Sequence, residues 1–158
     1  MKKQRIVIAV ILLVLLSGCG AEAMRDPIMT GNLVLEERKP PKVVITSEKA
    51  SYQMQQGNYD WQVEGEKEGE VMATIACGLS PGEMLKEKEL TGISKTETLV
   101  LQFDKEPDRY HIYGWYGDNA KMKVEKLEDL RGEEPVAIEV MAYYPQGESS
   151  YVLPVIFK

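Results

Sequence analysis

Residues 136–157 read VAIEVMAYYPQGESSYVLPVIF and show the clearest structural pattern in the chain. Apolar residues recur at every second position on both sides of Pro145-Gln146-Gly147, which is the period of a β-strand around a turn. The stretch therefore predicts an antiparallel hairpin. Pro154 has no backbone N–H, so we expect a sheet edge or a bulge there. The residues expected on the apolar faces are Val136, Ile138, Val140 and Ala142, then Tyr151, Leu153, Val155 and Phe157.

The same alternation extends back along the chain as far as Pro41. Gln56-Gly57-Asn58 has the composition of a turn, so residues 51–54 are expected to pair back on the strand that follows. About eight strands at short spacing, joined by turn residues, are typical of an antiparallel β-sandwich. The sequence therefore predicts an all-β domain over residues 42–158. Further sets expected to face the core are Tyr59, Trp61 and Val63; Val71, Ala73, Ile75 and Cys77; and Leu99, Leu101 and Phe103.

One segment departs from the strand pattern. Ser80-Pro81-Gly82-Glu83 places a capping residue before a proline and a glutamate three positions after the serine. This is the pattern of a capping box with proline in the first helical turn. It predicts a short helix from Pro81 to about Lys88. Because that helix carries few apolar residues, we expect it to cover an edge or an end of the sandwich.

The N-terminus has the organisation of an export signal. Two lysines and an arginine precede an 11-residue apolar run, Ile6 to Leu16, which is too short to span a bilayer. Leu16-Ser17-Gly18-Cys19 resembles the bacterial lipobox, which implies that Cys19 carries lipid and becomes the first mature residue. The alternatives are a lone anchor helix or an ordinary signal peptide cut near Ala21 or Ala23, and that cleavage would leave Cys19 unexplained.

These features divide the chain into a lipoprotein signal peptide (1–18), a lipidated tether (19–41) and the β-sandwich domain (42–158). The tether holds several prolines and glycines and mixed charge, as linkers do. The expected location is the extracytoplasmic face of a cell membrane. Lipid reached through Cys19 is the first expected partner, because two acyl chains hold a protein stably on a bilayer.

The charge of the mature chain limits its other partners. Residues 1–18 hold three of the 19 Lys and Arg and none of the 25 Asp and Glu, so their removal leaves a formal net charge of −9. Nucleic-acid binding relies on clustered basic residues, so it is not expected. If Cys19 carries lipid, Cys77 has no cysteine to pair with, and its position in an apolar set predicts a small buried hydrophobe.

Three blocks of the domain carry a resemblance. Gly57-Asn58-Tyr59-Asp60-Trp61, residues 103–108 and the closing hairpin from Ala142 to Tyr151 are similar to the Ser-Tyr-x-Trp, Phe-x-x-x-Pro and hairpin blocks of small uncharacterised lipoproteins of Gram-positive bacteria. Those proteins commonly have Trp where this chain has Tyr144. The resemblance covers about residues 42–158 and implies an immunoglobulin-like sandwich. It brings no activity with it.

The sequence offers little for catalysis. His111 is the one histidine, and no Gly-x-Ser-x-Gly elbow accompanies it, so we expect a strand histidine with no catalytic role. Glu64, Glu66, Glu68 and Glu70 follow a plain alternation around glycines, unlike the ligand spacing of calcium loops. We expect a solvated hairpin tip there. No metal, no cofactor and no enzymatic activity are predicted.

The stretch Arg109–Tyr116 is the candidate binding element, because strand alternation puts aromatic residues on both of its faces. Tyr110 and Ile112 are expected in the core. The candidate ligand-binding residues are His111, Tyr113 and Trp115 on the outward face, with Asp118 and Asn119 in the turn that follows. Outward aromatic residues suit sugar stacking or a protein hot spot. Truncation of Trp115 is therefore expected to weaken binding while costing little stability.

The predicted function is a non-catalytic binding module of the cell envelope, held at the membrane, with an unidentified protein or glycan as partner. Three alternatives remain at this point. The domain could regulate or inhibit a secreted envelope enzyme, bind a glycan through its aromatic residues, or be a small hydrolase, which is the least favoured of the three.

The anchor yields the first testable prediction. Cys19→Ala should accumulate as an uncleaved or mislocalised precursor, because the thiol that accepts lipid is lost. Acyl labelling and membrane fractionation, with Cys77→Ser as the matched control, measure this. Normal fatty-acid labelling and normal fractionation of Cys19→Ala would contradict the lipidation site.

Overall fold

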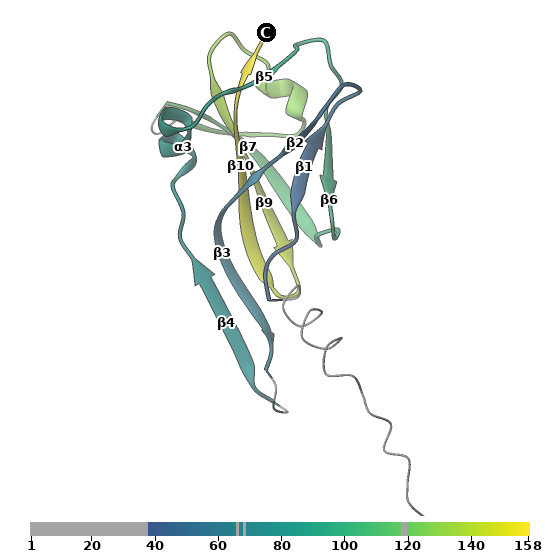
Figure 1. Cartoon of the computed structure of the whole chain (residues 1–158), viewed down its shortest axis with the longest axis vertical. Helices are drawn as coiled ribbons and strands as arrows, with labels where there is room; N and C mark the ends of the chain where they lie inside the picture. Colours follow the sequence, from purple (N-terminus) through teal and green to yellow (C-terminus); the bar gives the residue numbers. More distant parts are fainter. Residues whose placement is uncertain (1–37, 66, 68, 118–119) are drawn as a thin grey trace, which may run out of the picture. The chain divides into compact units, whose positions relative to one another are not determined.

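Two β-sheets face each other across one hydrophobic core in the computed structural model of the chain, which describes residues 38–65, 67, 69–117 and 120–158 (Figure 1). The smaller sheet has the strand order β2–β1–β6, and the larger has the order β4–β3–β10–β9–β7–β8, with β5 paired to β10. The prediction of an all-β sandwich is confirmed. The strands are β1 (Val43–Thr46), β2 (Ser51–Gln53), β3 (Gln55–Glu64), β4 (Val71–Ala76), β5 (Thr91–Ile93), β6 (Val100–Phe103), β7 (Arg109–Tyr116), β8 (Ala120–Val124), β9 (Val136–Tyr144) and β10 (Gly147–Phe157).

The predicted C-terminal hairpin is the centre of the large sheet. β9 and β10 pair antiparallel from Gly147↔Tyr144 to Val155↔Val136. β10 is flanked on its other side first by β3 and then, from Val155 onward, by β5 in parallel. Pro154 lies in the short interval between the last residue paired with β3, Val152, and the first paired with β5. The expectation of a local edge at Pro154 is confirmed, because neither β3 nor β5 pairs with it.

The core between the sheets combines residues far apart in the sequence. Val43 and Ile45 of β1 are fully buried, and they meet the inward faces of β7, β9 and β10. Burial of this apolar surface is the main favourable term in folding. The buried cluster consists of Val43, Ile45, Met54, Trp61, Ile93, Leu99, Ile112, Val124, Leu127, Leu130, Val136, Ile138, Val140, Ala142, Tyr144, Tyr151, Leu153, Val155 and Phe157.

The turn expected at Gln56-Gly57-Asn58 is wrong. β2 pairs with β1 in the small sheet, and after Met54 the chain continues directly into β3 of the large sheet. Met54 is only 2% exposed and occupies the point where the chain passes from one sheet to the other. Gly57 lies against Ser150, where a Cβ would come within 2.5 Å of the Ser150 hydroxyl. Its glycine therefore reflects close packing within the strand.

The helix α3 (Pro81–Glu87) forms where the sequence predicted it. The Ser80 hydroxyl accepts a hydrogen bond from the Glu83 N–H at 3.3 Å, and the Glu83 carboxylate accepts one from the Ser80 N–H at 2.8 Å. It packs on the central strands β9 and β10 of the large sheet and covers one end of them. Met84 is fully buried against Ala137 of β9 and Val152 of β10, on the face opposite the small sheet. We call that face the outer face.

The apolar set of β4 faces away from the core, contrary to expectation. Val71 is 64% exposed and Ile75 is 70% exposed. The register explains this, because Ile75 lies opposite Asp60 and so shares its face, while Trp61, on the other face of β3, is buried. Cys77 continues the same set and is also exposed, so the prediction of a buried thiol is wrong.

Two tyrosines of the central hairpin, Tyr144 and Tyr151, are buried. The Tyr151 hydroxyl donates a hydrogen bond to the Pro41 carbonyl at 2.7 Å. The Tyr144 ring meets the Trp61 ring edge-on, with centroids 5.3 Å apart. Burial raises the pKa of both phenols, so both remain uncharged at neutral pH.

Among the described residues, we find no helix whose length and apolar content would allow it to cross a membrane. Residues 1–37, which hold the predicted signal peptide, Cys19 and most of the predicted tether, lie outside these residues, as do Asp118 and Asn119. So do Glu66 and Glu68 of the acidic hairpin tip, whereas Glu64 and Glu70 are exposed as expected.

The turn of the central hairpin generates a stability prediction. Gly147 has φ of 146°, and a Cβ on it would lie 2.0 Å from the Asp60 carbonyl oxygen of β3. Gly147→Ala should therefore destabilise the domain by roughly 1–3 kcal/mol, the usual cost of backbone strain, plus the displacement of β3. Urea unfolding measures the change.

Gly132→Ala is the matched control, because its Cβ would meet nothing closer than 3.9 Å and its φ is not positive. We expect it to be neutral or stabilising by up to about 1 kcal/mol. Equal stability of the two variants would contradict the close approach of β3 to the turn.

Candidate binding face of the large sheet

The strand β7 presents its aromatic residues on two faces, as the alternation predicted. Ile112 is 5% exposed and packs in the core between the sheets. His111, Tyr113 and Trp115 are half-buried. Trp115 packs against Ala137 and Val152, which places these alternating residues on the outer face. Sequence analysis therefore assigned this face of β7 correctly.

Tyr110 was expected in the core but is 44% exposed. Its ring contacts Phe103 of the small sheet, with centroids 5.2 Å apart, so it does point toward the small sheet. Tyr110 is the second residue of β7, and at this end of the strand the two sheets no longer enclose its side chain. Alternation gave its direction correctly, but the depth of burial depends on the opposite sheet.

A row of four aromatic rings crosses the outer face. The His111 ring lies 6.3 Å from Tyr113 and 5.9 Å from Tyr143 of β9, and both pairs meet nearly edge-on. Trp115 follows Tyr113 along β7. We call Tyr143, His111, Tyr113 and Trp115 the aromatic row. Tyr143 was missed as a site residue, because only the β7–β9 pairing brings it beside His111.

Cations lie over both ends of the aromatic row. The Arg109 guanidinium is 4.5 Å from the centre of the Tyr143 ring. The Lys121 ammonium is 3.9 Å from the Tyr113 ring centre and 4.9 Å from that of Trp115. Such cation–π contacts are attractive and fix the ring orientation. The row is therefore held in place before any ligand arrives.

The Trp115 end of the row is built around a buried carboxylate. Glu139 is only 6% exposed. One of its oxygens accepts a hydrogen bond from the Trp115 indole N–H at 2.8 Å and lies 3.0 Å from the Lys121 ammonium. A buried charge is tolerated when it is paired and hydrogen-bonded in this way. The sequence signal for this site was a glutamate inside an otherwise apolar strand.

Helix α3 completes that end. Trp115 packs against the cluster of Met84, Ala137 and Val152, together with Leu79 and Leu85. Trp115 therefore anchors α3 to the sheet, and its truncation would open this contact. The low stability cost expected from sequence does not fit that arrangement.

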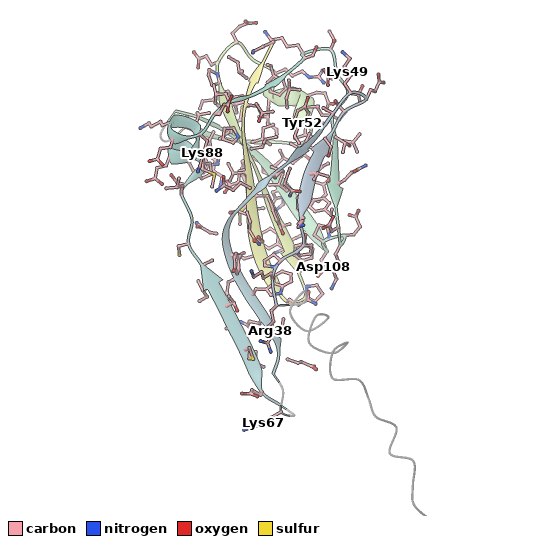
Figure 2. The ribbon with its side chains drawn as sticks, in the orientation of Figure 1. Arg38, Lys49, Tyr52, Lys67, Lys88 and Asp108 are labelled. Carbon is pink, nitrogen blue, oxygen red and sulfur yellow. The ribbon has the colours of Figure 1, made fainter. Side chains whose placement is uncertain are left out.

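The Tyr143 end of the row lies beside a cavity of about 450 Å³. Asp108, labelled in Figure 2, contributes to it and donates its backbone N–H to the Tyr143 carbonyl at 2.8 Å. The cavity places hydrogen-bonding groups of both charges beside the aromatic row. Its lining consists of Asp60, Gln62, Asp108, Arg109, Tyr143, Tyr144, Gly147 and Glu148.

The Cys77 thiol and the His111 imidazole lie far apart in the large sheet. Cys77 follows the edge strand β4, while His111 is on β7, four strand positions away in the sheet. At about 4.8 Å per strand, that places the two strands ~19 Å apart. No group of three or more metal-binding side chains occurs among the described residues.

The predicted site residues Asp118 and Asn119 lie outside the described residues. β7 ends at Tyr116 and β8 begins at Ala120. Gly117 has φ of 62°, the left-handed conformation that tight turns use. Whether their side chains contact a ligand stays a prediction.

Comparison with known proteins adds no identification. No family model, no curated protein and no solved structure matches this chain.

The packing of Trp115 under α3 can be tested by truncation. Trp115→Ala should lower the free energy of unfolding by about 2–4 kcal/mol, because it removes packing under α3 and leaves the Glu139 carboxylate short of a donor. Trp115→Phe should lower the free energy of unfolding less, by about 1–3 kcal/mol, because the phenyl ring keeps part of the packing while the indole donor is lost. Urea unfolding gives both values.

Tyr110→Ala on the same strand is the control, and as an exposed residue it should change stability by less than about 1 kcal/mol. If Trp115→Ala were as stable as Tyr110→Ala, Trp115 would not anchor the helix.

Proposed function

We propose that the chain is a membrane-anchored extracytoplasmic lipoprotein whose sandwich is a non-catalytic binding module. The observation that carries the proposal is the open half of the outer face. There Tyr143, His111 and Tyr113 are half-exposed in a fixed row beside a polar cavity. The other half of the same face is covered by α3. The structure thus leaves one preorganised aromatic surface available.

The composition of this surface favours a protein partner over a glycan. Sugar rings stack on free aromatic faces, but cations already lie over Tyr143 and Tyr113. Tyrosine, tryptophan and arginine are the residues enriched at the hot spots of protein interfaces. Holding the rings in place also lowers the entropy lost on binding. We therefore assign the aromatic row and its cavity to an envelope protein.

The anchor supports the same proposal from the sequence side. A lipid on Cys19 and a tether of about 20 residues would keep the domain within ~60 Å of the bilayer, at 3.3 Å per extended residue. The partner would therefore be a protein at or near the membrane surface. Regulation of a secreted enzyme is one form that such binding would take.

A photo-crosslinking residue placed at His111 of the full chain tests the surface in living cells. We expect it to form a discrete adduct with an envelope protein. Tyr143→Ala in the same chain should reduce that adduct, because loss of a hot-spot aromatic residue weakens binding by about 1–3 kcal/mol. The same photo-crosslinker at Gln102, an exposed residue of β6, is the matched control.

Two outcomes would contradict the proposal. One is an adduct pattern at His111 no different from that at Gln102. The other is co-sedimentation with purified cell-wall glycan that Tyr143→Ala abolishes, which would assign the surface to a glycan instead. Circular dichroism of Tyr143→Ala checks that the sandwich remains folded.

A further inference from the structure

The two edges of the large sheet differ in charge. β8 forms one edge, and its exposed segment carries Lys121 and Lys123. Charged side chains on an edge strand, lysine above all, prevent pairing with another chain. β4 forms the other edge, and Figure 2 shows no strand beyond it. Its six residues, Val71–Ala76, include no charged side chain.

β4 is also the longest edge strand that lacks this protection among the described residues. The edges of the small sheet, β2 and β6, have three and four residues. Short edges are themselves a protection against pairing. Val71 and Ile75, at 64% and 70% exposure, are the two most exposed large apolar residues described. An uncharged apolar edge of this length predicts a strand partner.

Part of the β3–β4 hairpin extends past the rest of the sheet. β10 pairs with β3 only as far as Trp61, whereas β3 continues to Glu64 and pairs there with Val71. Figure 1 shows this part as two strands beyond the β9–β10 turn. A two-stranded ribbon is only marginally stable by itself. A further strand alongside β4 would support it.

The backbone of β4 fixes which residues such a strand would meet. The Gly65 N–H donates to the Glu70 carbonyl at 2.7 Å, while the Gln62 N–H donates away from β4, to the Gln146 carbonyl at 2.8 Å. Backbone groups alternate between the two neighbours along an antiparallel strand. Those of Val71, Ala73 and Ile75 therefore face the open edge.

We propose that this edge pairs with the same edge of a second copy of the chain, antiparallel about a two-fold axis at Ala73. In this register Ala73 faces Ala73 of the second copy, and Val71 faces its Ile75. Each facing pair exchanges two backbone hydrogen bonds. The β-branched side chains then form cross-strand pairs on the outer face, which is a favourable combination.

The self-pairing explains why the edge is uncharged along its whole length. In an isologous contact every residue is used twice, so one charged side chain in β4 would enter the contact from both copies. The contact also closes on itself, because the remaining edges are short or carry lysine. Both outer faces lie on the same side of the joined sheet, so the dimer would present two aromatic rows together.

Disulfide trapping in membranes tests the pairing with the full chain. The parent carries Cys77→Ser, which removes the exposed thiol. Added diamide accepts the two electrons and two protons released when two thiols form a disulfide. Ala73→Cys should cross-link to a dimer of the chain, because facing Cα atoms of a hydrogen-bonded pair lie about 5.5 Å apart, within disulfide range.

Neighbouring positions serve as matched controls. Thr74→Cys is also exposed, but it lies off the axis and on the other face, so it should not cross-link to itself. Val71→Cys and Ile75→Cys should not cross-link separately, but a mixture of the two should. Self-cross-linking of Thr74→Cys, or none at Ala73→Cys, would overturn the proposal. So would a cross-link from Ala73→Cys to a different protein alone.

A second variant tests the contact without added cysteine. Ile75→Lys should lower the association constant of the detergent-solubilised full chain by at least about tenfold, equal to ~1.4 kcal/mol, because it places a charge on each side of the axis. Val100→Lys alters an equally apolar exposed residue on β6 and should leave association unchanged. Sedimentation gives both constants, and equal values would overturn the proposal.

Discussion

The pairing of β9 with β10 is the interaction on which the rest of the structure depends. The two strands stay in register over nine residue pairs, and both are buried along nearly their whole length. Strands buried on both faces need a cover on each side. The small sheet supplies one cover. On the opposite face, α3 supplies the other through Met84, which packs on Ala137 and Val152. The hairpin therefore requires a third layer, although a sandwich has two.

That third layer is short, and this explains where the candidate site lies. α3 has seven residues and covers only one end of the outer face. Trp115 lies at the boundary of the covered part, where Glu139 and Lys121 fix the indole. Beyond this boundary the outer face has no cover among the described residues, and the aromatic row continues into the open. A buried charge network thus marks the point where packing under α3 ends and the proposed binding surface begins.

The sheet edges follow a related rule. An edge strand exposes unpaired backbone groups, so its side chains decide whether it remains unpaired. β8 carries two lysines, of which Lys121 also orients the aromatic row. β4 has no such charge and exposes Val71 and Ile75. The two edges of the large sheet therefore differ. The lysines of β8 oppose pairing with another strand, whereas the proposed pairing uses the uncharged edge of β4.

The sequence by itself determined the all-β class, the central hairpin, the helix and the division of a strand's residues between two faces. The period-two pattern of residues 136–157 predicted the central hairpin, the capping box predicted α3, and alternation put His111, Tyr113 and Trp115 on one face. These features are local, because they depend on residues only a few positions apart.

Only the tertiary structure decided which face of each strand is buried by other segments of the chain. Val71 and Ile75 looked like core residues until the pairing of Ile75 with Asp60 placed them outside. Tyr110 points toward the core but lies where the small sheet no longer covers it, and Trp115 is covered by a helix whose position the sequence did not give. Alternation divides the residues of a strand between two faces. Burial of either face depends on contacts with segments distant in the sequence, and the pattern of a single strand does not predict those contacts.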